Sequence, residues 1–203
     1  LVLSHPFDAR GSRWEMSEDI TEPTVAIEIA FTLIPPDGDA QPFFPNAARH
    51  ILYGVMLSFM LTGEPWTFGT LVRALKDPKR IRSILRRHPQ TREIVKQYFY
   101  DERLLLNIMS TLATKLLPFE PIAAAWDAAT TSFSLRDWVT GNWILVLGNY
   151  ETGRTAIDAI NRCIFKRASD LTLNLPNSHR RRSWFFLDEL AEVGGRGGLP
   201  GLS

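Results

Sequence analysis

The chain has 203 residues, of which 45% are hydrophobic and 22% are charged, and its formal net charge is +1. These values are typical of an ordinary globular protein and exclude a disordered chain. Because the net charge is close to zero, any case for nucleic-acid binding must rest on a local cluster of basic residues. The single cysteine, Cys163, excludes an internal disulfide and the usual cysteine-rich metal clusters, and it favours a reducing compartment.

The start of the chain predicts a short strand and a helical stretch that ends at a sharp break. Leu1–Ser4 is the strand candidate, and Trp14 is expected to pack the following turn against the sheet. Residues 17–33 are helix-prone, although their apolar side chains do not form one clean face. Residues 35–39, with the sequence PPDGD, interrupt any helix. A helical insertion is therefore expected to begin near Phe43.

The next segment, residues 43–129, carries helix signals throughout and no strand signal. Its expected helices run from a candidate N-cap at Asn46 to Gly63, from a cap at Thr67, from Asp77-Pro78, from about Gln90 to Leu116, and over Ile122–Ala129. Apolar residues recur at i, i+3 and i+4 spacing within them, which is typical of amphipathic helices that share a core. This segment is predicted to be an all-α subdomain.

A run of basic residues lies within this subdomain, at Lys76–Lys96. It comprises Lys76, Lys79, Arg80, Arg82, Arg86, Arg87, Arg92 and Lys96. On a helix that buries Ile81, Ile84 and Leu85, such a run faces outward and is able to neutralise phosphates. The alternative interpretation is an ordinary solvated helix face. The candidate DNA contacts are Lys79, Arg82, Arg86 and Arg87.

Residues 130–203 predict a return to a sheet. Trp143–Leu147 and Trp184–Leu187 are unbroken apolar runs, a pattern typical of strands buried on both faces of a parallel sheet. The helix between them carries an apolar stripe that includes Cys163, which is expected to be a buried and inert thiol. Strand, helix and strand together predict a right-handed βαβ unit.

Two adjacent carboxylates, Asp188 and Glu189, follow the second apolar run. Ligands bind at the carboxyl ends of strands in open α/β sheets, and charges there need a cation or water as a partner. This is the layout of a Walker B strand, in which the aspartate holds Mg²⁺ through water and the glutamate orients and deprotonates the attacking water. The alternative is a buried strand followed by a helix N-terminus, where the helix dipole favours acidic residues.

The segment Gly148–Thr155 reads GNYETGRT and lies between a predicted strand and a predicted helix, which is the context that a P-loop requires. Arginine, however, stands at position 154, where a P-loop needs lysine. A planar guanidinium fits poorly in the tight phosphate nest that a compact ammonium group occupies. Because Arg154 follows the carboxyl end of a predicted sheet strand, it remains a candidate nucleotide contact.

Four segments, in the same order along the chain, resemble type IV secretion system coupling proteins, the ATPases that move DNA during conjugation. The segments are HPFDARGSRW at His5–Trp14, TLIPPDGDAQPFFPNAAR at Thr32–Arg49, FSLRDWVTGNWILVL at Phe133–Leu147, and RRSWFFLDELAEVGGRGGLPGL at Arg181–Leu202. The resemblance implies an α/β fold, a partial RecA-like P-loop ATPase domain that is predominantly helical because of an inserted all-α subdomain. The implied domains are residues 1–42 in the nucleotide-binding domain, 43–129 in the insertion, and 130–203 in the return with the Walker B strand.

The same resemblance implies a function. The complete protein would be a DNA-translocating ATPase that uses ATP and Mg²⁺, with Asp188 and Glu189 as its catalytic carboxylates. Its partners would be single-stranded DNA, the relaxase or relaxosome, and components of the secretion channel. It would act as a homo-hexamer on the cytoplasmic side of a bacterial inner membrane, anchored by a segment before Leu1. In this family the Walker A lysine also lies upstream, so the chain alone is expected to be inactive as an ATPase.

One departure from the family and two alternative functions stay open. Residues 194–198, with the sequence GGRGG, stand where the family continues with a leucine-rich helix, and glycines weaken a helix there. One alternative is a different RecA-like motor, such as a chromosome-segregation translocase or a secretion ATPase. The other is a non-catalytic docking relative, which the absence of a Walker A lysine from the upstream sequence would favour.

Overall fold

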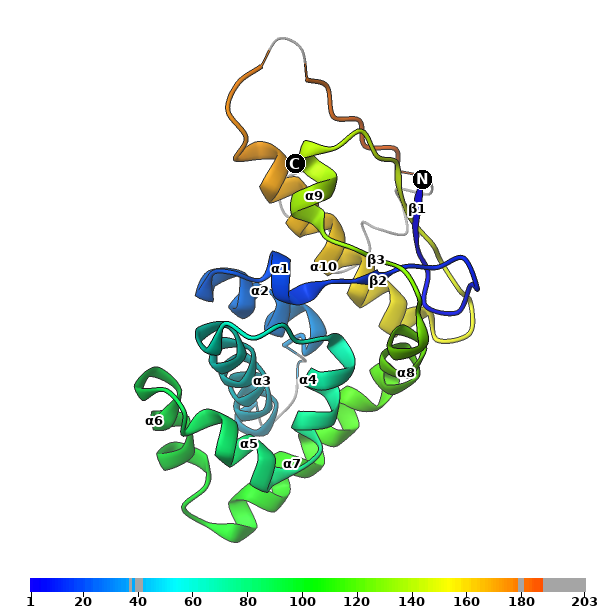
Figure 1. Ribbon diagram of the computed structural model, residues 1–203. Helices are drawn as coiled ribbons and strands as arrows, with labels where there is room; N and C mark the ends of the chain where they lie inside the picture. The colour runs from blue at the N-terminus through cyan, green and yellow to red at the C-terminus, as the bar shows by residue number, and fades with distance from the viewer. Residues whose placement is uncertain (37, 39–41, 179–180, 188–203) are drawn as a thin grey trace.

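The structure is a computed structural model that describes residues 1–36, 38, 42–178 and 181–187. Most of these residues are helical, and two pairs of short parallel strands complete the described fold. Figure 1 shows that the helices from the middle of the chain gather at one end of the molecule, whereas the N-terminal strand lies toward the other end.

The N-terminal segment forms β1 (Val2–Ser4), β2 (Arg13–Trp14), α1 (Met16–Asp19) and α2 (Pro23–Leu33). The predicted strand at the start of the chain is confirmed. The predicted helical stretch over residues 17–33 is present as two helices, because the chain leaves helical geometry at Ile20 and Pro23 then occupies the first turn of α2. Proline is favoured in a first turn, since its missing N–H has no intrahelical partner there.

Residues 42–129, which we call the helical unit, contain helices and no strand. The unit consists of α3 (Phe43–Thr62), α4 (Phe68–Leu75), α5 (Pro78–Leu85), α6 (Pro89–Tyr98), α7 (Glu102–Leu116), a 3₁₀ turn (Leu117–Phe119) and α8 (Glu120–Ala128). The predicted caps of α4 and α5 are confirmed. The Thr67 hydroxyl accepts a hydrogen bond from the Thr70 N–H at 3.1 Å, and the Asp77 carboxylate accepts one from the Lys79 N–H at 2.8 Å.

Two predicted helix boundaries in the helical unit are wrong. Asn46 is not an N-cap, because α3 begins three residues earlier, after Pro42, and the Asn46 Oδ1 instead accepts from Arg49 Nη1 at 2.8 Å. The single helix expected from Gln90 to Leu116 is two helices, α6 and α7. The chain breaks there because the Asp101 carboxylate accepts a hydrogen bond from the Leu104 N–H at 2.7 Å and so caps a new helix.

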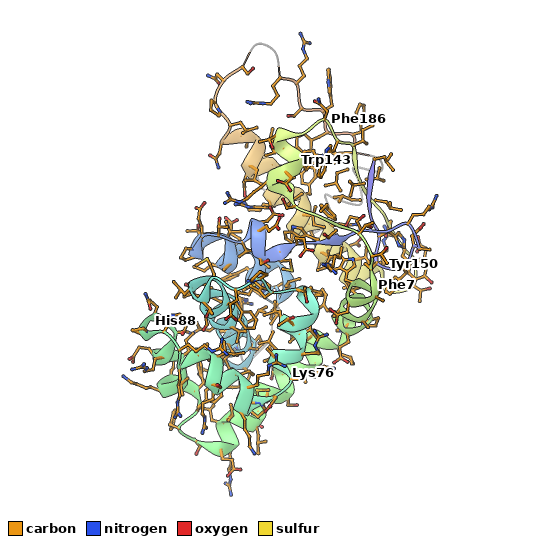
Figure 2. The ribbon with its side chains drawn as sticks, in the orientation of Figure 1. Phe7, Lys76, His88, Trp143, Tyr150 and Phe186 are labelled. Carbon is orange, nitrogen blue, oxygen red and sulfur yellow. The ribbon has the colours of Figure 1, made fainter. Side chains whose placement is uncertain are left out.

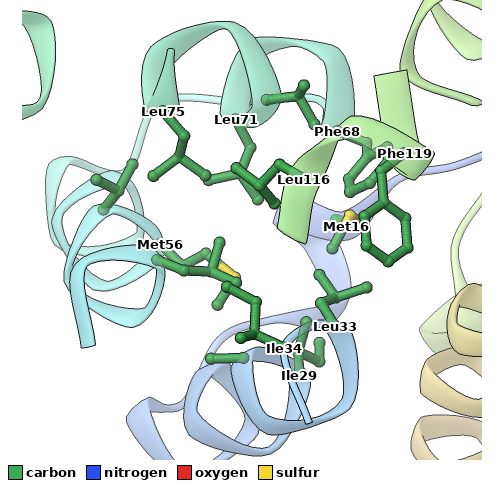
Figure 3. Close-up of a cluster of buried hydrophobic side chains, with 14 of the residues drawn as sticks. Met16, Ile29, Leu33, Ile34, Met56, Phe68, Leu71, Leu75, Leu116 and Phe119 are labelled. Atoms are coloured by element: carbon green, nitrogen blue, oxygen red, sulfur yellow. The ribbon is translucent and has the colours of Figure 1, made fainter. Parts of the chain in front are cut away.

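Helix α3 is the centre of the core and packs against α2, α5, α6 and α7. Figure 3 shows how Met56 of α3 meets side chains that come from α2, α4 and α7, among them Ile34, Leu75 and Leu116. Gly54 allows the close approach of α5 and α6, since a Cβ there would lie 2.3 Å from Ile94 Cδ1. Although α3 is apolar, no helix in the described part of the chain is long and apolar enough to cross a membrane.

The strands form two separate parallel pairs. β1 pairs with β4 (Leu145–Leu147), with Val2 opposite Leu145 and Ser4 opposite Leu147. β2 pairs with β3 (Ser132–Phe133), so that the chain before the helical unit lies beside the chain after it. Two further helices, α9 (Leu135–Thr140) and α10 (Arg154–Leu173), follow β3 and β4 respectively.

Of the two buried strands predicted after the helical unit, the one at residues 143–147 is confirmed only in part and the one at residues 184–187 is wrong. Residues 181–187 contain no strand, and Trp184 and Phe186 are 70% and 90% exposed. Of the residues in 143–147 only the last three form a strand, and Ile144 is 65% exposed. A strand requires partners for its backbone groups, and residues 181–187 pair with neither β1 nor β4. The predicted βαβ unit is therefore not formed.

A buried carboxylate joins the two segments that precede and follow the helical unit, residues 1–36 and the described residues from 130 to 187, which together we call the strand-bearing part. Asp19 of α1 is fully buried, and its carboxylate accepts hydrogen bonds from Trp14 Nε1, the Leu135 N–H and the Arg136 N–H, while Arg167 donates to its carbonyl oxygen. Burial outweighs these contacts and raises the pKa of Asp19 above its ordinary value. These bonds tie β2, α1, α9 and α10 together.

The predicted burial of Cys163 is confirmed. The side chain lies on the inner face of α10, where it is 4% exposed. Burial raises the pKa of its thiol to about 12. The thiolate is therefore absent at neutral pH, and the thiol is unreactive for that reason as well as for its inaccessibility.

Candidate nucleic-acid interface

The basic run predicted from the sequence forms one surface over α5, α6 and the turn between them. We call it the α5–α6 basic surface; it comprises Lys79, Arg80, Arg82, Arg86, Arg87, Arg92 and Lys96. The predicted helix face is confirmed, since Ile81, Ile84 and Leu85 are buried and turn the basic side chains outward. Lys76 is held apart from this surface by an ion pair of 2.6 Å with Glu120.

The four candidate DNA contacts do not have the same environment. Lys79, Arg86 and Arg87 are exposed, whereas Arg82 is half-buried. The Arg82 Nη2 donates to the Phe99 carbonyl oxygen at 3.3 Å, and its guanidinium carbon lies 5.5 Å from the centre of the Phe99 ring. This contact fastens the end of α6 to α5, so Arg82 has a packing role that the sequence did not indicate.

The surface is held rigidly from beneath by buried hydroxyl groups. Ser58 of α3 donates to the Ile84 carbonyl at 2.7 Å, and Thr91 of α6 donates to the Leu85 carbonyl at 2.8 Å. Together they bind the carboxyl end of α5 to the helices on either side of it. These bonds fix the backbone at the end of α5, which carries part of the basic surface.

His50, which lies beside the last residue of α6, adds no positive charge to this surface. His50 Nδ1 lies 3.1 Å from the Tyr98 hydroxyl and is half-buried. Burial lowers the pKa of His50 and raises the pKa of Tyr98. Both side chains are therefore neutral at pH 7, and the charge of the surface comes from its lysines and arginines.

A second group of polar and aromatic side chains lies at the carboxyl ends of β1 and β4. Because these strands are parallel, the segments that follow them adjoin: His5 Nε2 lies 3.2 Å from the Asn149 carbonyl, and the Phe7 and Tyr150 rings are 5.3 Å apart. Figure 2 shows these two rings side by side. The sequence analysis did not predict this cluster. It would follow from the parallel pairing of β1 and β4, because the segments after two parallel strands meet at the same edge of the sheet.

Arg154 is the first residue of α10, at the edge of this cluster. Its Nη1 lies 3.8 Å from Glu151 Oε1 and its Nε lies 3.7 Å from Asp158 Oδ2. Two carboxylates so close to a helix N-terminus oppose an incoming phosphate. The geometry of Gly148–Thr155 is therefore unfavourable for a P-loop, and a contact between Arg154 and a nucleotide stays a prediction.

Asp188 and Glu189, the candidate catalytic pair, lie outside the described residues, and so does the predicted Mg²⁺ position. As a donor set, an aspartate and a glutamate suit Mg²⁺ and its bound water, since both supply the carboxylate oxygens that this ion prefers. Among the residues that the structure describes, no three His, Cys, Asp or Glu side chains are grouped closely enough to hold a metal ion.

Comparisons with known proteins agree with the fold described above. The family model "Type IV secretion-system coupling protein DNA-binding domain" matches residues 2–196. The coupling protein TraD of Escherichia coli (strain K12) is 24% identical over 199 residues, which cover 93% of this chain and 27% of TraD. The bacterial conjugative coupling protein TrwBdeltaN70, solved in an unbound monoclinic form, has a similar fold, with a TM-score of 0.61 at 19% identity.

The chain is much shorter than either of these proteins. It spans 27% of TraD, and the structural match to TrwBdeltaN70 covers 94% of this chain but 45% of that one. The match therefore concerns one part of each larger protein.

Proposed function

The chain belongs to the DNA-binding domain family of type IV secretion-system coupling proteins, and from this premise we propose that it is part of a motor that moves single-stranded DNA. The α5–α6 basic surface binds the DNA backbone during transfer. The relaxase attached to that DNA, and components of the secretion channel, are the protein partners. The complete protein acts as a homo-hexamer on the cytoplasmic side of an inner membrane to which it is anchored.

The observation that carries this proposal is the exposure of basic side chains on a rigid helical support. Lys79, Arg86 and Arg87 extend from α5 into solvent, while Ser58 and Thr91 fix the helix end beneath them. DNA binding by such a surface releases counterions from phosphates and is strong and salt-dependent.

The motor activity is assigned to the strand-bearing part of the chain. We assign the parallel pair of β1 and β4 to part of a RecA-like sheet. Asp188 would hold Mg²⁺ through water, and Glu189 would orient and deprotonate the water that attacks the γ-phosphate. Bound ATP would supply the energy for DNA movement. The resemblance of residues 181–202 to the family's Walker B segment supports this assignment.

The salt dependence of DNA binding tests the proposal. Replacing Arg86 and Arg87 by alanine should weaken binding to an oligo-deoxythymidine strand and reduce the slope of log affinity against log salt concentration. Each single-strand phosphate contact contributes about 0.7 to that slope, so the loss of two contacts should change it by roughly 1.4. The measurement is fluorescence anisotropy at several salt concentrations.

A control variant with the same loss of positive charge shows whether the effect depends on the α5–α6 basic surface or only on the net charge of the protein. Arg10 and Arg162 are exposed arginines of the strand-bearing part, and replacing both by alanine removes the same charge without touching α5 or α6. This variant should keep the wild-type slope. Equal slopes for all three proteins would contradict DNA binding by the α5–α6 basic surface, and a loss of relaxase binding in the Arg86 and Arg87 variant alone would identify the surface as a protein-docking site.

A further inference from the structure

One aromatic ring of the helical unit is left in solvent beside the basic surface. Three aromatic residues are consecutive where α6 meets α7, and the first two, Tyr98 and Phe99, are 5% and 8% exposed. Tyr98 contacts His50, and Phe99 lies beneath the guanidinium of Arg82. Tyr100, the third, is 75% exposed. Two of these rings therefore pack in the fold, whereas the Tyr100 ring is left mostly in solvent.

Tyr100 lies at the rim of a hollow that mixes apolar and cationic groups. The side chains that line it are Arg86, Arg92, Val95, Lys96, Phe99 and Tyr100. Val95 and Phe99 are 8% exposed each and form its apolar part. A flat aromatic surface next to arginine and lysine side chains matches the two halves of a nucleotide, an aromatic base and an anionic phosphate.

The cationic side of the hollow is partly ordered without a ligand. Arg92 Nη2 donates to the Arg86 carbonyl at 3.3 Å, which holds the Arg92 side chain across the end of α5. The ion pair between Lys96 and Glu93 is 2.6 Å long, with both side chains about two-thirds exposed, so a phosphate can replace Glu93 at little cost. Asp101 is the acidic residue next to Tyr100 in the sequence. Its carboxylate is engaged by the Leu104 N–H, from which it accepts a hydrogen bond as the cap of α7.

We propose that this hollow binds an unpaired nucleotide, with the base stacked on Tyr100 and the phosphate held by Arg86, Arg92 and Lys96. The inference rests on the proposed function, DNA binding by the α5–α6 basic surface, and adds that the surface distinguishes single strands from duplex. In a duplex the faces of the bases are covered by their neighbours, so they are not free to stack on a protein ring. An unpaired base offers its face to Tyr100.

The test compares variants of Tyr100 on matched single-stranded and duplex DNA of equal length. Tyr100→Ala should lower the affinity for the single strand roughly tenfold, which is within the range of one lost base–aromatic stack. The affinity for duplex and the salt slope should stay at the wild-type values, because no charge is lost. Tyr100→Trp and Tyr100→Phe keep a ring and should keep most of the affinity.

A strand of abasic sugar-phosphate residues isolates the stacking contribution. Wild-type protein and the Tyr100→Ala variant should bind this strand equally, since it has no base to stack. Tyr150→Ala, which removes an exposed tyrosine from the segment after β4 and outside the α5–α6 basic surface, is the matched control and should behave as wild type on every strand. Circular dichroism of each variant checks that the helices remain folded.

The outcomes separate this inference from the proposed function. Equal loss of single-strand and duplex affinity in Tyr100→Ala would overturn the inference, and so would unchanged single-strand affinity. If the Arg86 and Arg87 variant nevertheless shows its reduced salt slope, the basic surface still binds DNA through phosphates alone. An unchanged slope in that variant would overturn the proposed function itself.

Discussion

The helical unit and the strand-bearing part of the chain differ in how fully they bury their own apolar side chains. Helix α3 buries residues along most of its length, and three of its neighbours, α4, α5 and α7, begin at caps supplied by the residue before each helix. In the strand-bearing part β1 and β4 form a ladder of three residue pairs, and Ile144, Trp184 and Phe186 are exposed. Apolar runs occur in both parts, so hydrophobicity alone does not decide which run is buried.

The difference follows from where each kind of element finds its hydrogen-bond partners. A helix pairs its backbone groups within four residues, and a cap completes its end locally. A strand pairs its backbone only with another strand, and its two faces are covered only when neighbours lie on both sides. The helical unit therefore pairs its backbone groups within its own helices, whereas burial of residues 143–147 and 181–187 depends on what lies beside them.

The largest expected effect tests whether the chemistry belongs to the strand-bearing part. In the complete protein, Glu189→Gln should lower the rate of ATP hydrolysis by roughly 10²- to 10⁴-fold, because an amide keeps the shape of the side chain but cannot accept the proton of the attacking water. Nucleotide binding should remain, whereas Asp188→Asn should weaken Mg²⁺-dependent nucleotide binding. Phosphate release measures the first effect and fluorescent-nucleotide titration the second.

A nearby carboxylate provides the control for this change. Glu192→Gln alters the same charge three residues away and should leave the hydrolysis rate unchanged. If Glu189→Gln hydrolysed ATP at the wild-type rate, the general base would have to be sought elsewhere in the protein.

The next effect compares one apolar side chain from each part. Leu52→Ala in α3 should lower the free energy of unfolding by about 2–5 kcal/mol, because the side chain is fully buried and its removal leaves a cavity. Phe186→Ala removes a larger side chain that is 90% exposed and should change the free energy of unfolding by only about 0.5 kcal/mol or less. Urea denaturation of the two variants measures both values. A large loss of unfolding free energy in Phe186→Ala would contradict the proposed difference between the helical unit and the strand-bearing part.

The smallest of the three effects concerns the junction at Asp19, where the segment before the helical unit meets the segment after it. Asp19→Ala should lower the free energy of unfolding by about 2 kcal/mol, because it leaves the Trp14 Nε1 and the Leu135 and Arg136 N–H groups without their acceptor. Glu18→Ala removes an exposed carboxylate from the same helix and serves as the matched control. Thermal unfolding followed by circular dichroism compares them. Equal stability of the two variants would mean that the junction contributes nothing.

The helical unit was largely predictable from the sequence because its signals are local. Thr67 and the pair Asp77-Pro78 marked helix starts that the structure confirms. The break between α6 and α7 was missed, although Asp101 is a favourable cap residue, because apolar residues continue at helical spacing on both sides of it. Capping residues thus located the starts of α4 and α5 but not the start of α3, where Asn46 is not the cap.

What the sequence did not predict depends on contacts between distant residues. The bond from Arg82 to Phe99 spans 17 positions, so an inspection of the basic run could not separate Arg82 from Arg86. The exposure of residues 184–187 depends on strand pairing, which composition does not determine. Asp188 and Glu189 were identified by motif and resemblance, and both lie outside the described residues, so their roles stay predictions. The exposure of Tyr100 could not be predicted from the sequence, because the two aromatic residues directly before it, Tyr98 and Phe99, are buried in the core.

The parallel pairing of β2 with β3 also bears on how proteins with this fold can diverge. Trp14 lies opposite Phe133, so residues 15–131 leave the framework and return to it at adjacent backbone positions. A segment with adjoining ends can change in length at little cost in closure entropy, since each doubling of a loop costs only about 0.6 kcal/mol. Exchanging residues 15–131 between homologues would exchange the α5–α6 basic surface with them, provided that the contacts of Asp19 and α2 with α9 and α10 are kept.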